Sequence, residues 1–414
     1  MHSLTFIDVF AGAGGLAEGF IANGFKPVAH VEMNKHACDT LVTRLSYYYL
    51  KENGKLDVYF KYLRGEISRD ELLKCIPMSV INSVINETIT DDNIDDIFSF
   101  IDTELNPKGT PVDVLVGGPP CQAYSLVGRA VTGKRIQNDP RNFLYRLYVK
   151  FLNRFKPKVL VFENVQGLLS ANNGLYLESL KKSIEDAGYT INLRVLTASD
   201  YGVLQNRRRV IILGIRNDLP ESDLYPEPVK FAHKFFVKDV LSDLPVLKDV
   251  FFDNNYLSSP NEYCVSSGIR TDNDVLTWHV KRPINEHDKE IYRMAIELWN
   301  SKKKRIKYTD IPQKMRTHKN QKAFLDRFKV VAANECESQT ILAHLSKDGH
   351  YFIHPDINQC RSISVREAAR LQSFPDSYFF EGSRGAAFTQ IGNAVPPLMS
   401  SAIANKIKKY LEEK

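Results

Sequence analysis

The sequence predicts an α/β fold, with a parallel, doubly wound sheet whose ligand-binding loops follow the carboxyl ends of its strands. Residues 4–10 form a β-branched and aromatic run that enters the glycine-rich turn 11–15 and then a helical stretch. The apolar run 112–116 is broken by two glycines and two prolines, and the apolar run 159–162 ends on a carboxylate. Buried strands that stop at glycine-rich or polar loops are typical of sheets that bind ligands at one edge.

Length and composition indicate an ordinary globular protein with room for more than one domain. The chain has 414 residues, of which 43% are hydrophobic and 25% charged. No apolar run approaches the roughly 20 residues needed to cross a bilayer, and the first residues lack a signal-peptide pattern. The six cysteines are scattered, without a Cys-x-x-Cys pair or clustering with histidine. We therefore expect a cytoplasmic protein with no membrane association, no disulfide framework and no metal site.

The net charge of +6 is unevenly distributed. Between residues 270 and 330 there are 16 Lys/Arg and 8 Asp/Glu, so this segment carries +8 and the remainder of the chain −2. The segment contains the run Lys302, Lys303, Lys304 and Arg305. Basic side chains interleaved with aromatic rings predict a polyanionic partner such as a nucleic acid, and a solvated helix face is the alternative.

The first strand and turn suit an adenosine-bearing cofactor. Glycines such as Gly12 and Gly14 let the backbone approach a ligand closely. The next predicted strand, 27–32, ends on Glu32, 17 residues after Gly15, near the spacing of a carboxylate that binds ribose hydroxyls. The glycine spacing differs from the dinucleotide fingerprint Gly-x-Gly-x-x-Gly, and an exposed capping acid is the alternative for Glu32.

Cys121 follows Pro119 and Pro120 directly after the strand 112–116. A thiol at this place, with its backbone preset by prolines, is a candidate nucleophile, and a buried structural cysteine is the alternative. The polar run 128–141, which ends on Arg141, has four basic side chains and could close over a substrate or be an ordinary surface loop.

Two later segments add charged groups to the same predicted edge. Glu163 lies near the carboxyl end of the predicted strand 159–164, where it could protonate or hydrogen-bond a substrate ring. The arginines of 207–209 precede the strand 210–215 and could hold a phosphate or a carbonyl oxygen, with surface ion pairs as the alternative.

Beyond residue 215, prolines cluster and the alternation of strands and helices becomes irregular, which predicts a second domain. We expect a first domain part at 1–225, a second domain at 226–354 and a return to the first domain at 355–414. The return consists of a helix over 361–374 stopped by Pro375, a loop over 390–397 and a last amphipathic helix over 398–411.

Six motifs in order resemble those of DNA (cytosine-5) methyltransferases. They are Phe6-Ile-Asp-Val-Phe-Ala-Gly-Ala-Gly-Gly15, Gly118-Pro-Pro-Cys-Gln122, Glu163-Asn-Val165, Gln205-Asn-Arg-Arg-Arg209, Arg366-Glu367 and Gly392-Asn393. The resemblance covers about residues 3–217 and 355–410. It implies a class I S-adenosylmethionine-dependent methyltransferase fold with a smaller target recognition domain in the middle, and a last helix that packs beside the first motif.

The resemblance also implies roles for individual residues. Catalysis would fall to Cys121, Glu163, Arg207 and Arg209: the thiolate adds to C6 of a flipped cytosine, Glu163 acts at N3 and Arg209 at the carbonyl oxygen. S-adenosylmethionine would be held by Phe10, Gly12, Gly14, Glu32, Gly118, Pro120, Asn393 and Ala394. Double-stranded DNA would contact Gln122, Ser125, Arg141 and the run 302–305. The acid that contacts the adenine amino group in the family has two possible counterparts here, Glu66 and Thr88, and the assignment of this contact stays open.

This family suggests a monomeric, nucleoid-associated enzyme of a bacterial restriction-modification system, with a cognate endonuclease as a candidate partner. An RNA (tRNA) cytosine-5 methyltransferase is the main alternative, and a middle region of about 130 residues favours DNA. A catalytically idle DNA-binding protein is disfavoured because it would need neither Cys121 nor Glu163. The absence of Gly-x-Gly-x-x-Gly disfavours a nicotinamide oxidoreductase.

Overall fold

The structure, a computed structural model, describes residues 3–120, 143–229, 233–248 and 250–413. Four residues expected at the catalytic centre or on DNA, Cys121, Gln122, Ser125 and Arg141, lie outside these ranges. Within the described ranges, no helix combines the length and apolar character needed to cross a membrane.

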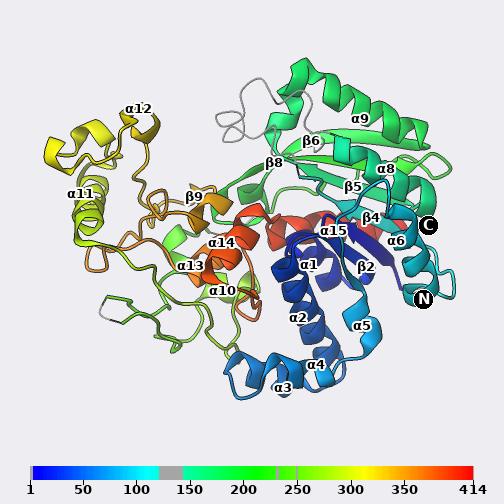
Figure 1. The fold of residues 1–414 in the computed structure, drawn as a ribbon, viewed down its shortest axis with the longest axis horizontal. Helices are drawn as coiled ribbons and strands as arrows, with labels where there is room; N and C mark the ends of the chain where they lie inside the picture. The colour runs from blue at the N-terminus through cyan, green and yellow to red at the C-terminus, as the bar shows by residue number, and fades with distance from the viewer. Residues whose placement is uncertain (1–2, 121–142, 230–232, 249, 414) are drawn as a thin grey trace.

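A seven-stranded sheet forms the centre of the molecule, in the order β3-β2-β1-β4-β5-β8-β6 (Figure 1). Neighbouring strands from β3 to β5 pair in parallel, and β8 is antiparallel to both β5 and β6. The order reverses between β1 and β4, the point at which doubly wound sheets bind their ligands. The sheet strands are β1 (Thr5–Val9), β2 (Lys26–Glu32), β3 (Val84–Asn86), β4 (Val114–Gly117), β5 (Val159–Asn164), β6 (Tyr189–Thr197) and β8 (Arg208–Arg216).

Helices cover both faces of the sheet, as the predicted fold class requires. Two short strands, β7 and β9, form a separate parallel pair. The helices are α1 (Gly15–Ala22), α2 (Lys35–Glu52), α3 (Leu56–Leu63), α4 (Arg69–Lys74), α5 (Met78–Asn82), α6 (Ile94–Phe100), α8 (Leu144–Phe155), α9 (Leu175–Asp186), α10 (Glu262–Ser266), α11 (Glu286–Lys302), α12 (Gln321–Phe324), α13 (Val365–Leu371), α14 (Arg384–Asn393) and α15 (Pro397–Glu412); β7 is Gln205–Asn206 and β9 is Ser338–Gln339.

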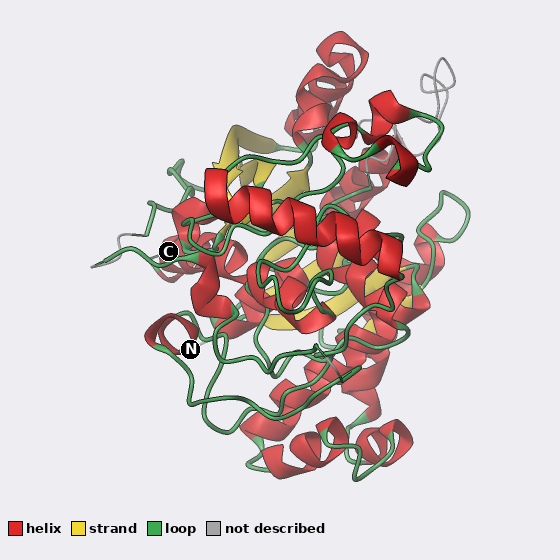
Figure 2. Cartoon of the chain, turned by 90° about the vertical axis from the view of Figure 1, so that its left-hand side faces the viewer, coloured by secondary structure: helices red, strands yellow, loops and turns green. Residues whose placement is uncertain are grey.

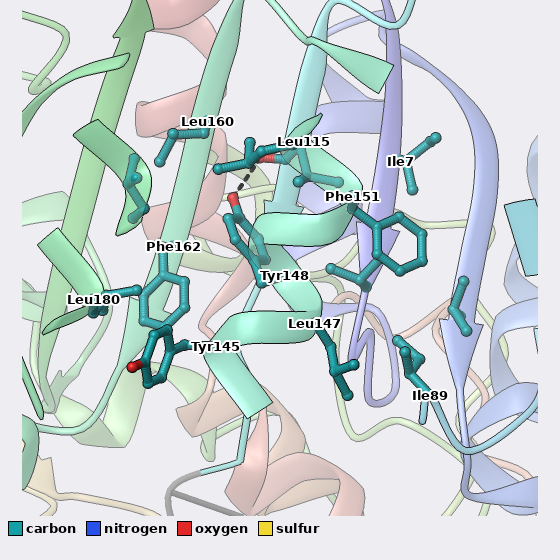
Figure 3. Packing of buried hydrophobic residues seen from close by; sticks show 14 of the residues in the cluster. Ile7, Ile89, Leu115, Tyr145, Leu147, Tyr148, Phe151, Leu160, Phe162 and Leu180 are labelled. Carbon is teal, nitrogen blue, oxygen red and sulfur yellow. Dashed lines mark hydrogen bonds between the residues drawn. The ribbon is translucent and has the colours of Figure 1, made fainter. Parts of the chain in front are cut away.

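One face of the sheet packs against α6, α8 and α9. Phe151 and Leu152 of α8 are fully buried against apolar side chains of β1, β4 and β5 (Figure 3). The hydroxyl of Tyr148, also on α8, donates to the backbone oxygens of Leu115 and Val161, each 3.1 Å away. The aromatic residues of α8 therefore both fill the core and fix the helix over the junction of β4 and β5.

The opposite face packs against α1 and α15, so the last helix of the chain lies beside the first. Two glycines of α1 permit this contact. A Cβ atom at Gly15 would lie 2.3 Å from the Val395 oxygen, and one at Gly19 would lie 2.3 Å from the Ser401 nitrogen. The closeness of the two backbones brings the segment before α15 to the first glycine turn.

The C-terminal helices differ from the predicted bounds for local reasons. The expected helix 361–374 is confined to α13, because Ser364 begins it by accepting from the Glu367 nitrogen in a capping box. The expected loop 390–397 is partly helical, since α14 continues to Asn393 and ends where Ala394 becomes extended ahead of Pro396.

The middle region contributes to two cores. Side chains from 237–269 and 331–352 pack with α13 and α14, next to the sheet domain. A second cluster gathers around α11, with Ile291, Ile296, Tyr308 and Phe328 among its buried members. Helices α11 and α12 project away from the sheet (Figure 1), and α11 lies across the front of the molecule in Figure 2.

Candidate active site

The carboxyl ends of β1, β4 and β5 meet at one edge of the sheet. Val9 pairs with Gly117, and Gly117 pairs with Phe162. The next residues of the three strands, Phe10, Gly118 and Glu163, are therefore neighbours. Because β8 runs the other way, its first residues, with Arg209 among them, reach the same edge.

The backbone that leads to Cys121 lies directly against Glu163. A Cβ atom at Gly118 would be 2.7 Å from Oε2 of Glu163, so only glycine fits there while the carboxylate keeps its place. The side-chain amide of Asn164 donates to the Pro119 oxygen over 3.2 Å. Pro120, an exposed residue, is the last one described before Cys121. The first two residues of the Gly-Pro-Pro turn are thus held against the end of β5.

Glu163 and Arg209 form an ion pair, with Nε 2.8 Å from Oε1. The two side chains are only 13% and 12% exposed, respectively. Burial lowers the pKa of Arg209, and the carboxylate of Glu163 opposes that shift. A buried arginine held by a carboxylate presents fixed hydrogen-bond donors at this edge, a suitable arrangement for a carbonyl oxygen that gains negative charge.

Arg207 is fully buried, and its guanidinium is directed toward backbone oxygens. Nη1 donates to Ile341 over 2.8 Å and Nη2 to Gly392 over 3.0 Å. Burial and the charge of Arg209 lower the pKa of Arg207 well below its usual value. Its predicted contribution of positive potential stays a prediction. The hydrogen bonds give Arg207 a structural role, because they connect the junction of β7 and β8 to two segments that are distant in the sequence.

The turn between β1 and α1 forms a glycine cradle. Phe10, Gly12 and Gly14 all have positive φ, of 57°, 55° and 79°, and a bulky residue in this region is under backbone strain of a kind found mainly at functional sites. A Cβ at Gly12 would meet no atom within 4 Å, which leaves space beside the backbone. Glu32 braces the turn, accepting from the Gly12 nitrogen over 2.8 Å.

Glu32 also accepts from the Asn34 nitrogen over 2.7 Å, and burial raises its pKa. Beside β2, the strand β3 is followed by Glu87 and Thr88, whereas Glu66 lies in the turn after α3, paired with Arg64. Of the two residues left open by the sequence, Thr88 is the one that follows the third strand, at the same edge as Glu32.

The C-terminal segment completes this part of the site. Asn393, an exposed residue, ends α14, and the methyl group of Ala394 lies 2.9 Å from the position of a Cβ at Gly15. The Tyr378 hydroxyl donates to the Ala13 oxygen of the same turn. Residues 10–14 and 393–394, far apart in the sequence, thus lie side by side. Sequence reasoning missed Tyr378, which no motif marks.

The basic run of the middle region lies elsewhere. Lys302 ends α11, and Lys303 to Arg305 follow it as exposed residues. Lys303 has one distant acidic neighbour, with Nζ 3.9 Å from Oε1 of Glu335. Helix α11, which the basic run ends and follows, projects away from β5 and β8, the strands of Glu163 and Arg209 (Figure 1). In the part of the chain that the structure describes, no group of His, Cys, Asp and Glu is arranged to hold a metal ion.

Comparison with known proteins places this chain in one family. The family model of C-5 cytosine-specific DNA methylases matches residues 4–62 and 82–409. The Type II methyltransferase M.Bpa9945I of Bacillus paralicheniformis is 43% identical over 450 aligned positions, which cover 99% of each chain. The Type II methyltransferase M.XorII of Xanthomonas oryzae pv. oryzae is 30% identical, over 99% of this chain and 85% of its own length.

The crystal structure of a "putative DNA modification methyltransferase" encoded within an Escherichia coli prophage has the same fold, with a TM-score of 0.64 at 22% identity over 99% of this chain. The residues that the family model leaves unmatched, 63–81, contain α4 and most of α5. With the family model spanning nearly the whole chain and the strand ends arranged as described, this protein belongs to the C-5 cytosine-specific DNA methylases and is a DNA (cytosine-5)-methyltransferase.

Proposed function

We propose that this enzyme transfers a methyl group from S-adenosylmethionine to C5 of a flipped-out cytosine within a specific double-stranded DNA sequence, as the modification enzyme of a bacterial Type II restriction-modification system. The observation that carries the catalytic part is the ion pair of Arg209 and Glu163 at the end of β5, packed against the Gly118 that precedes the Cys121 turn. The Type II names of the relatives support the biological part.

The cradle fits the cofactor. The open space at Gly12, the positive φ of Phe10 and Gly14 and the carboxylate of Glu32 frame it, and Asn393 and Ala394 lie beside the same turn. Gly118 and Pro120 would bound the space toward the base. Glu32 would accept from the ribose hydroxyls, as a carboxylate at the end of a second strand does in related sheets. When bound, S-adenosylmethionine supplies an electrophilic methyl group.

The residues at the edge would activate the base. The Cys121 thiolate forms a bond to C6, and the ring's electron pair moves to C5, which becomes nucleophilic. Glu163 would give a proton or hydrogen bond to N3, while Arg209 donates to the carbonyl oxygen as charge develops. After methylation, loss of the C5 proton to a base expels the thiolate and restores the aromatic ring.

A duplex hides C5 and C6, so the cytosine must leave the stack at a cost of a few kcal/mol. We assign compensating contacts to Gln122, Ser125, Arg141 and the exposed run Lys302, Lys303, Lys304 and Arg305. We propose a catalytic domain of 1–225 and 355–414 and a recognition domain of 226–354. The cluster around α11 belongs mostly to the recognition domain and is joined by Cys360 of the catalytic domain. We further propose a cytoplasmic, nucleoid-associated monomer with a cognate endonuclease as partner.

The test is to map methylated cytosines in DNA from cells that express this chain or its Cys121→Ala variant. We expect one methylated sequence context with the wild type and none with the variant, while purified variant still binds duplex DNA because the thiol contributes chemistry more than affinity. Retained methylation in Cys121→Ala would remove the proposed nucleophile. Methyl transfer to tRNA but not to duplex DNA would favour the RNA alternative.

A further inference from the structure

Two buried glutamines connect β7, the short strand just before the one that carries Arg209, with the proposed cofactor loop. Gln205 opens β7, and its side chain is fully buried. Its Nε2 donates to the Leu371 oxygen over 2.9 Å and to Oε1 of Gln372 over 2.6 Å. Its Oε1 accepts from the Ile341 nitrogen over 2.9 Å. One amide therefore contacts both the end of α13 and Ile341 of the middle region.

Gln372, also fully buried, extends this connection. Its Nε2 donates to the Ala394 oxygen over 2.7 Å, while its Oε1 accepts from Gln205. An amide can donate and accept at once, so the two glutamines form a continuous chain of hydrogen bonds from β7 to Ala394. Four residues after Gln205, the next strand, β8, presents Arg209 to Glu163.

Arg207 makes a parallel connection. It donates to the oxygens of Ile341 and Gly392, so the loop at Asn393 is held on both sides, by Arg207 before it and by Gln372 after it. A buried pair of amides lowers the stability of the fold unless every donor and acceptor has a hydrogen-bond partner. Apolar side chains would fill the same volume without this requirement. The pair instead fixes the relative position of two backbone segments that are far apart in the sequence.

Resting on the function proposed above, we propose that Gln205 and Gln372 are positioning residues for methyl transfer. Their paired amides hold the Asn393–Ala394 loop, proposed to face the cofactor, at a fixed place relative to β7, which leads directly into the strand β8 that presents Arg209 to the base. Loss of the Gln372 amide leaves the Ala394 oxygen and one Gln205 donor unpaired, so the loop would relax. The affinity for the cofactor and the rate of methyl transfer should both decrease, although neither glutamine is proposed to contact a reactant.

The first test compares Gln372→Met with Tyr189→Phe. Tyr189 is a stability control: its buried hydroxyl donates to the Pro157 oxygen over 2.8 Å, at the opposite edge of the sheet from the site. We expect both variants to lose thermal stability, and only Gln372→Met to raise the calorimetric Kd for S-adenosylmethionine by about tenfold. Its KM for the cofactor should rise likewise and its kcat on duplex DNA should fall. A Kd and a kcat equal to those of Tyr189→Phe would overturn the proposal.

The second test uses Gln372→Glu and a pH series. Burial raises the pKa of the introduced carboxyl, so at about pH 6 it is protonated, donates to the Ala394 oxygen and still accepts from Gln205. At about pH 8 more of it is ionised and cannot donate. The ratio of its Kd for S-adenosylmethionine to the wild-type Kd should therefore rise with pH, whereas a ratio that does not change with pH would contradict the role of this hydrogen bond.

Calorimetry separates this proposal from the proposed function. If the wild type binds S-adenosylmethionine and the glutamine variants weaken that binding, the positioning role stands whatever nucleic acid is methylated. If the wild type methylates DNA and the variants bind the cofactor normally, the positioning role alone fails.

Discussion

Arg209 and Glu163 face each other across two antiparallel strands, with Nε of one 2.8 Å from Oε1 of the other. The register of β5 and β8 pairs Glu163 with Ile211, two residues beyond Arg209. The ion pair therefore depends on the reversed direction of β8, which turns the amino end of that strand toward the carboxyl end of β5. An acid and a fixed cationic donor are available together at the place where the Cys121 turn begins.

Replacing Glu163 by glutamine should slow the chemistry without weakening cofactor binding. The amide can still accept from Arg209 but cannot transfer a proton, so we expect the rate constant of methyl transfer to fall by about 10²–10⁴-fold. Single-turnover transfer of a labelled methyl group to DNA measures the effect. Glu178→Gln, an exposed change on α9, is the matched control and should behave as wild type. A Glu163→Gln enzyme with wild-type turnover would remove this residue from the proposed acid role.

Gly12→Ala should act on the cofactor cradle and can be compared with an equally strained glycine. Gly12 and Gly65 both have positive φ, of 55° and 72°, and a Cβ at either meets no atom within 4 Å. Each alanine should cost roughly 1–2 kcal/mol of folding free energy through backbone strain. Only the methyl group that Gly12→Ala adds enters the space proposed for the cofactor, so only this variant should weaken S-adenosylmethionine binding in calorimetry. Equal affinities in the two variants would argue against the cradle.

Neutralising the run 302–305 with alanine should weaken DNA binding and reduce its salt dependence. For each phosphate that the protein no longer neutralises, the slope of log K against log salt becomes shallower by about 0.9. Binding to a duplex at several salt concentrations measures this slope. The control removes four exposed lysines from other regions, Lys26, Lys51, Lys55 and Lys74. The same reduction of slope in both variants would show that bulk charge, and not this run, is responsible.

His354 should make stability pH-dependent. Burial lowers the pKa of this side chain from 6.5 to about 4. Between these values the unfolded chain binds a proton that the folded chain does not, so this contribution is fully present above pH 6.5 and is lost as pH falls toward 4. The full difference is on the order of 3 kcal/mol. Urea unfolding of wild type and His354→Gln across this window should show a smaller pH dependence in the variant.

Two neighbours bear on that measurement. Burial would raise the pKa of Glu367, but Arg361 holds it well below its usual range, so this carboxylate stays ionised throughout the window. Burial also lowers the pKa of His279, which leaves part of the pH dependence in place in the variant. If the free energy of unfolding of His354→Gln depends on pH as strongly as that of the wild type, groups other than His354 cause the whole effect.

Much of the fold could be predicted from local patterns. The strands that carry Glu32 and Glu163 at their carboxyl ends could be predicted because buried parallel strands are short apolar runs with abrupt polar ends. The last helix was predicted over 398–411 and occurs as α15. The bounds of α13 and α14 were less predictable, since they depend on Ser364 as a cap and on an extended Ala394.

By itself, the sequence determined the order of the motifs, and hence the family, the sheet and the candidate groups, because each motif is a local requirement of residue type and spacing. The tertiary structure decided which groups meet. Arg207 is directed toward the oxygens of Ile341 and Gly392, and Gln372 reaches Ala394, because strand register and the return of α15 bring these segments together. Contacts between residues far apart in the chain leave no periodic pattern in a single sequence, and only the folded chain contains them.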